Sequence, residues 1–168
     1  MKLTVTKVKA VRGHDDSQPF EGTLLADGKP VADLFDDGWG GEVQIHWKGG
    51  KENAEVWAAI MALGEERHLK EHPEEGLEKA KESARLYGVG ELAQMACDAL
   101  MVKRMVRLAK KNVLFTTPNM GTGEYMTLKA PYDQKVKDYL AGKHPNATIL
   151  NDFIDDPVKI KQALKLVD

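Results

Sequence analysis

Apolar and polar side chains alternate along residues 1–47, which is the pattern of half-buried β-strands. Four stretches carry it, at residues 2–12, 20–26, 29–35 and 42–47. A loop is expected at 13–19. Asp27 and Gly28 separate the second and third stretches, and Asp-Gly is a strong hairpin signal because glycine readily adopts the positive φ of a tight turn. The pattern therefore predicts an N-terminal antiparallel β-meander.

The same alternation predicts details of the strands. The apolar residues change parity between Val5 and Val8, which predicts a bulge or twist in the first strand. With a two-residue turn at Asp27 and Gly28, the hairpin register puts four apolar residues on one face: Phe20, Leu24, Val31 and Phe35. The fourth strand has Val43, Ile45 and Trp47 on its apolar side.

From residue 53 the apolar period becomes helical. Asn53 is placed to cap a helix that ends at Gly64. The charged segment 65–88 has a thin apolar stripe and predicts a surface helix, whereas 90–112 is apolar almost all round through Leu100 and predicts a buried helix.

After Asn112, two β-like stretches at 113–117 and 124–129 predict a second hairpin. Pro131 starts a helix with Tyr132, Val136, Tyr139 and Leu140 on one side, a short strand follows, and Asp156 with Pro157 starts a last helix. The predicted class is α+β: an N-terminal antiparallel β-meander, a helical middle, and a C-terminal β-hairpin followed by helix-strand-helix. We expect a single domain over 1–168, with lobes at 1–50 and 51–168 as an option. Whether the two hairpins share a sheet stays open.

Composition narrows the setting. The chain has 168 residues, 42% of them hydrophobic and 30% charged, which is typical of a soluble globular domain. The sequence shows no membrane-spanning stretch and no secretory signal, and its single cysteine, Cys97, fits a reducing compartment; we expect a cytoplasmic protein. The net charge of −2 and pI near 6.2 favour no polyanionic partner, so nucleic-acid binding would need a local patch.

Trp39 stands among Gly38, Gly40 and Gly41, between two predicted strands. The indole either folds back onto the meander or points into solvent. An exposed, rigid aromatic is typical of a binding hot spot, and nearby acids would steer it toward a basic partner. The candidate partner-binding residues are Asp36, Asp37, Trp39 and Glu42.

Basic residues line one edge of the predicted 90–112 helix. Lys103, Arg107 and Lys111 are spaced four apart, with Arg104 and Lys110 beside them. This edge is a candidate nucleic-acid-binding surface. Alternatively, the same residues complement the negative end of the helix dipole and cover apolar surface with their methylenes.

Residues 68–72, HLKEH, match the H-x-x-E-H arrangement of some zinc peptidases, with His68 and His72 as metal ligands and Glu71 as base. However, Pro73 disfavours helical backbone at His72, so a solvated turn is the alternative. No dinucleotide fingerprint or phosphate-binding loop is present, and we expect no cofactor.

Two segments, LLADGKPVADLFDDGWGG (24–41) and LKAPYDQKVKDYLAGKHPNATILND (128–152), resemble small uncharacterised proteins encoded by phages, prophages and plasmids. The resemblance transfers no catalytic residue. It implies a setting in which accessory proteins bind and block host defence machinery or manage nucleic acid.

These observations give three hypotheses. The first is a non-enzymatic phage or mobile-element accessory protein that binds and modulates a host protein through the Trp39 loop, as an anti-defence inhibitor would. The second is a nucleic-acid-binding protein using the basic edge. The third is a metal-dependent hydrolase built on HLKEH. The partner's identity and the oligomeric state do not follow from the sequence.

Overall fold

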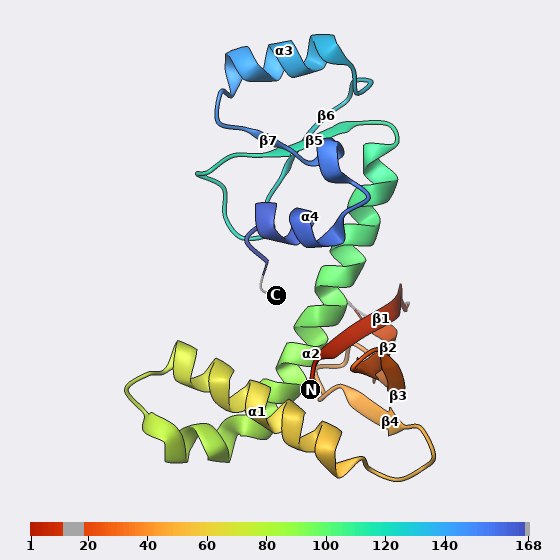
Figure 1. The fold of residues 1–168 in the computed structure, drawn as a ribbon, viewed down its shortest axis with the longest axis vertical. Coiled ribbons are helices and arrows are strands. Elements are labelled where there is room, and N and C mark those ends of the chain that lie inside the picture. The colour runs from red at the N-terminus through yellow and green to blue at the C-terminus, as the bar shows by residue number, and fades with distance from the viewer. Residues whose placement is uncertain (12–18, 167–168) are drawn as a thin grey trace. The chain divides into compact units, whose positions relative to one another are not determined.

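The computed structural model describes residues 1–11 and 19–166, which form an α+β fold as predicted (Figure 1). The chain divides into two compact units, Met1–Leu100 and Met101–Asp168, and each is described by itself below. The boundary falls inside a long helix, whereas the sequence pattern suggested lobes that meet at residue 50. A strand-to-helix change in pattern thus does not mark the change of unit, because the first helices pack on the meander.

The first unit begins with a four-stranded antiparallel sheet of order β1-β2-β3-β4, so the predicted meander is confirmed. The strands are β1 (Leu3–Ala10), β2 (Phe20–Ala26), β3 (Lys29–Asp36) and β4 (Gln44–Trp47). The predicted irregularity in β1 is also confirmed, since its register shifts between Thr6 and Lys9. The loop expected at 13–19 lies, apart from Pro19, outside the described residues.

The register of the β2–β3 hairpin differs from the prediction after its first two pairs. Ala26 faces Lys29 as expected, but a shift between Leu24 and Leu25 sets Leu24 opposite Ala32. This bulge reverses which β3 side chains point inward. The buried face therefore consists of Phe20, Leu24, Ala32 and Leu34, while Val31 and Phe35 are only half-buried.

Two helices complete the first unit, α1 (Ala54–Glu71) and the start of α2 (Gly76–Ala109). Asn53 caps α1 as predicted, accepting a hydrogen bond from the Val56 N–H. Two expectations were wrong: Gly64 does not end α1, and the segments around 76–88 and 90–109 form one helix. Gly64 instead lies where α1 crosses α2, and a Cβ there would sit 1.9 Å from the Ala84 carbonyl oxygen.

The core of the first unit lies between the sheet and these helices. Val56 and Ile60 of α1, with Leu92 and Ala96 of α2, join the buried face of the sheet in one apolar cluster. At about 25 cal/mol per Å² of buried apolar surface, such a cluster is the main source of stability for the unit.

The second unit contains a separate three-stranded sheet of order β6-β5-β7, so the two hairpins do not share a sheet. Its elements are β5 (Val113–Thr116), β6 (Met126–Leu128), α3 (Gln134–Lys143), β7 (Thr148–Ile149), the 3-10 helix η1 (Leu150–Phe153) and α4 (Pro157–Ala163). Asp156 caps α4 as predicted. Helix α3 begins after Asp133, not at Pro131, and its Tyr139 is 53% exposed, not inward-facing.

Within the described residues, no helix combines the length and apolarity needed to cross a membrane.

Candidate functional site

The loop between β3 and β4 holds Trp39 in solvent. Its indole is 73% exposed. Gly38 and Gly40 on either side have φ values of 76° and 79°, a backbone region that other residues rarely adopt. The outward arrangement, one of the two left open by the sequence, is the one that the structure has.

Short-range hydrogen bonds shape this Trp39 loop. The Gly38 N–H donates to Asp36 Oδ1 at 2.8 Å, and the Trp39 N–H donates to Asp37 Oδ1 at 2.9 Å. Both are contacts from an aspartate to the backbone two residues on, which mimic a backbone turn. The two predicted steering acids therefore also fold the loop.

The surroundings of the loop are acidic. Neither Lys nor Arg occurs between Pro30 and Trp47, a stretch that holds four acidic residues: Asp33, Asp36, Asp37 and Glu42. Asp33 is paired with Lys48 at 2.9 Å, and Glu42 with Arg85 of α2 at 3.0 Å. Glu42 is thus partly neutralised, which leaves the steering of a basic partner mainly to Asp36 and Asp37.

Beyond the loop, residues of β4, α1 and α2 line a cavity of about 330 Å³. Trp47 and Trp57 meet edge-to-face there, with ring centroids 6.3 Å apart, and Arg85 lies over Trp57. The residues from Glu42 to Ile45, which follow the Trp39 loop along the chain, form part of its wall, so a recess of mixed aromatic and polar lining lies next to the loop in sequence.

The connection between α1 and α2 brings the two histidines of HLKEH together. Helix α1 ends at Glu71, and His72 has the non-helical angles expected before a proline. The rings of His68 and His72 are nevertheless only 5.3 Å apart, and both contact Tyr87 of α2 edge-on. His68 is buried, with 3% of its surface exposed.

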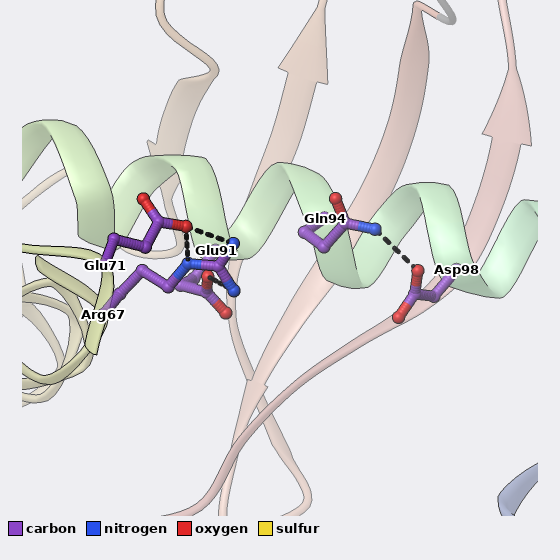
Figure 2. A network of polar contacts seen from close by, with 5 residues as sticks. All are labelled: Arg67, Glu71, Glu91, Gln94 and Asp98. Carbon is purple, nitrogen blue, oxygen red and sulfur yellow. Dashed lines mark hydrogen bonds and ion pairs between the residues drawn. The ribbon is translucent and has the colours of Figure 1, made fainter. Parts of the chain in front are cut away.

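Glu71 does not face these histidines. Arg67 lies between Glu71 and Glu91 and pairs with both, as Figure 2 shows. Glu74 and Glu75 take the place that the sequence prediction gave to Glu71: Glu75 Oε2 is 3.2 Å from His68 Nε2, and Glu74 Oε1 is 3.9 Å from His72 Nδ1. The Glu-Glu pair after Pro73 was the sequence signal for them, since a turn there can fold back toward His68.

Next to this turn, α1 and α2 form a cavity of about 300 Å³ lined by Arg67, Glu71, Tyr87 and Glu91, among others. Gln94 also lines it and donates a 2.8 Å hydrogen bond to the buried Asp98 (Figure 2). On this wall Arg67 is paired with Glu71 and Glu91.

The basic edge lies in the second unit, and all five of its residues are exposed: Lys103, Arg104, Arg107, Lys110 and Lys111. Helix α2 ends at Ala109, so the last two lie in the turn beyond the helix. The chain has no Asp or Glu from 99 to 123, which leaves this edge uniformly positive in sequence.

The pKa values of Cys97 and Asp152 are also shifted. Partial burial, with Asp98 and Asp36 nearby, raises the pKa of the Cys97 thiol, which disfavours the thiolate and a nucleophilic role. In the second unit, Asp152 accepts hydrogen bonds from Tyr132 and Lys137. The Tyr132 hydroxyl and the Lys137 ammonium lower the pKa of Asp152.

Comparisons of this chain with protein-family models, with curated proteins and with solved structures found no match.

Proposed function

We propose that this protein is a non-enzymatic binding protein whose main contact is the Trp39 loop. The observation that carries the proposal is the 73% exposure of Trp39 in a loop whose backbone is already ordered. Tryptophan is the side chain most enriched in binding hot spots, and burying it in a partner's pocket removes a large apolar surface from water.

Preorganisation strengthens this argument. Ordering a flexible loop on binding costs free energy that reduces affinity. Here Asp36 and Asp37 already hold the N–H groups of Gly38 and Trp39, and the indole has only two side-chain torsions to fix. Binding therefore has fewer backbone and side-chain torsions left to order.

The partner that fits is a protein with an apolar pocket rimmed by Lys or Arg. The acids of the loop favour a basic rim, and the absence of Lys and Arg between Pro30 and Trp47 disfavours an acidic one. The resemblance to phage, prophage and plasmid proteins suggests a bacterial host protein, with inhibition of a defence component as the effect.

A photo-crosslinking amino acid placed at Gly41, where an added side chain meets nothing within 4 Å, tests the proposal in bacterial cells with Trp39 intact. The control carries it at Tyr139, an exposed aromatic of the second unit. We expect one dominant crosslinked protein at position 41 that is not captured at position 139. The purified partner should then bind Trp39→Ala about 30-fold more weakly, which corresponds to the roughly 2 kcal/mol of a hot-spot residue.

Equal binding of that partner by wild-type protein and by Trp39→Ala contradicts the proposal, as does the same crosslinking profile at both positions. Circular dichroism of Trp39→Ala should be unchanged, because the side chain is not part of the core.

A second candidate function is nucleic-acid binding by the basic edge. It is supported by five exposed cations within a stretch that has no acidic residue. A local positive surface of this kind can hold phosphates although the net charge of the whole chain is −2.

Fluorescence anisotropy with labelled single- and double-stranded oligonucleotides across a salt series separates the two candidates. Phosphate binding predicts an affinity that falls steeply with salt and a shallower slope for Arg104→Gln with Arg107→Gln. Affinity that is unchanged in this double variant would exclude the basic edge as a nucleic-acid contact.

A further inference from the structure

His68 is a buried polar side chain whose hydrogen-bonding capacity is not used. Its exposure is 3%, and neither ring nitrogen has a hydrogen-bond partner among the described residues. Buried polar groups are nearly always satisfied, and an unsatisfied one costs about 1–3 kcal/mol. The 3.2 Å approach of Nε2 to Glu75 Oε2 is a close charge contact without the alignment of a hydrogen bond.

One donor group, the Glu75 carboxylate, lies beside this nitrogen, and two more lie beside Glu75. The ligand atoms of His72, Glu74 and Glu75 all lie within 4.8 Å of one another, and Glu75 links this group to His68. Two ligand atoms on a tetrahedral zinc ion lie about 3.3 Å apart, because Zn–N and Zn–O bonds are about 2.0 Å long. The 3.2 Å and 3.9 Å contacts already approach this spacing, and His72 and Glu74 are exposed enough to rotate.

We infer that the turn between α1 and α2 is a binding site for a divalent transition-metal ion, with Zn²⁺ as the best fit. Imidazole nitrogens with carboxylate oxygens form a donor set that suits Zn²⁺ better than Mg²⁺ or Ca²⁺, which prefer oxygen alone. Two neutral imidazoles and two carboxylates carry a charge that balances a dication.

The ligand set differs from the H-x-x-E-H arrangement. Glu71 is held by Arg67 and takes no part, while Glu74 and Glu75 of the turn replace it. All four ligands lie at the end of α1 or in the turn that follows it, and Tyr87 of α2 packs against both imidazoles. The role of the ion is that of a clip that fixes this turn, since a ligand bound only to the folded state stabilises that state.

Calorimetric titration of ZnCl₂ into the full chain, expressed without a histidine tag and first treated with chelator, tests the site. We expect one ion per chain and a rise in the thermal unfolding midpoint. His72→Ala and Glu75→Gln should each weaken binding about tenfold or more, and both variants should fold because these side chains are partly exposed.

Two control variants make the same kinds of substitution outside the site, one at a histidine and one at a glutamate. His46→Ala removes an exposed histidine of β4, and Glu78→Gln removes a carboxylate of the first turn of α2 that is paired with Lys81. Both should bind Zn²⁺ as the wild type does. Trp39→Ala should also leave Zn²⁺ binding unchanged, so this test is independent of the Trp39 loop.

Proton NMR of the imidazoles identifies the ligands directly. Zn²⁺ should shift the resonances of His68 and His72 and leave those of His46 and His144 in place. Three results would overturn the inference: no stoichiometric binding, binding that His72→Ala and Glu75→Gln retain in full, or shifts that spare His68.

Discussion

The Trp39 loop and the α1–α2 turn are both short connections in the first unit, but they are built in different ways. The Trp39 loop is held by aspartates that bond to N–H groups two residues ahead. The α1–α2 turn depends on side chains from two helices, with His68 from α1 meeting Glu75 and Tyr87 across the connection.

This difference decides how each responds to change. A loop made by local hydrogen bonds keeps its shape as long as its own residues are present. The histidine cluster keeps its shape only while α1 and α2 approach closely, and that approach depends on Gly64 and Gly88. A Cβ on Gly88 would lie 2.3 Å from the Ile60 carbonyl oxygen.

The largest expected effect comes from Gly64→Ala. The added methyl would overlap the backbone of Ala84 and Gly88, which cannot move away as a flexible side chain can. We expect the free energy of unfolding to fall by about 3 kcal/mol or more, the upper range for overpacking, together with loss of the Zn²⁺ response. Urea unfolding followed by circular dichroism measures it.

Gly90→Ala is the matched control for Gly64→Ala, since a Cβ there meets nothing within 4 Å. It should raise the free energy of unfolding by about 0.5–1 kcal/mol, because alanine favours the helix. Equal destabilisation by the two substitutions would show that the close helix crossing is not what makes Gly64 necessary.

Asp36→Ala with Asp37→Ala tests the local construction of the Trp39 loop. Losing two hydrogen bonds should weaken binding of the crosslinked partner about fivefold or more, since each contributes about 0.5 kcal/mol or more of ordering. The free energy of unfolding should change little, and Zn²⁺ binding not at all. Asn at both positions should restore most of the affinity, because its oxygen accepts the same bonds. Failure of the Asn variant to restore it would assign the acids to charge steering alone.

His68→Leu tests the α1–α2 turn with a substitution that should remove Zn²⁺ binding and leave the stability of the metal-free protein nearly unchanged. Replacing a buried side chain usually lowers the free energy of unfolding by several kcal/mol. His68 differs because its two nitrogens are unsatisfied. In the presence of chelator, an apolar side chain of similar size should therefore keep the free energy of unfolding within about 1 kcal/mol of the wild-type value. Zn²⁺ should no longer raise the unfolding midpoint. A large loss of stability in chelator would mean that His68 makes a contact worth more than its burial costs.

The smallest expected effect is at the base of the Trp39 loop, where the hydrogen bond from Lys48 lowers the pKa of Asp33. The pKa of Asp33 in the folded state lies below its value in the unfolded state. The contact therefore stabilises the protein at pH values above the ordinary aspartate pKa, and this stabilisation is lost as the pH falls through the folded-state pKa. Lys48→Met should return the pKa of Asp33 toward 3.8 in an NMR titration of its carboxyl carbon. The lowered pKa of Asp156, which caps α4, should not move, and an unchanged Asp33 titration would contradict the pairing.

Much of this protein follows from its sequence because the relevant interactions are local. The period-two alternation, the Asp27-Gly28 turn, and the caps at Asn53 and Asp156 depend on neighbours within a few residues, and each is present as predicted. The glycines and aspartates around Trp39 belong to the same class, since they indicate a tight loop without reference to the rest of the chain.

Tertiary structure alone decided the rest. One extra residue in β3 changed which side chains face the core, and the close crossing of two helices placed Gly64 inside α1, where its sequence context suggested an end. The same crossing sets Tyr87 and Glu75 against His68 and separates Glu71 from it. Sequence spacing cannot predict such contacts, because they depend on how two elements pack and not on the conformation of either one.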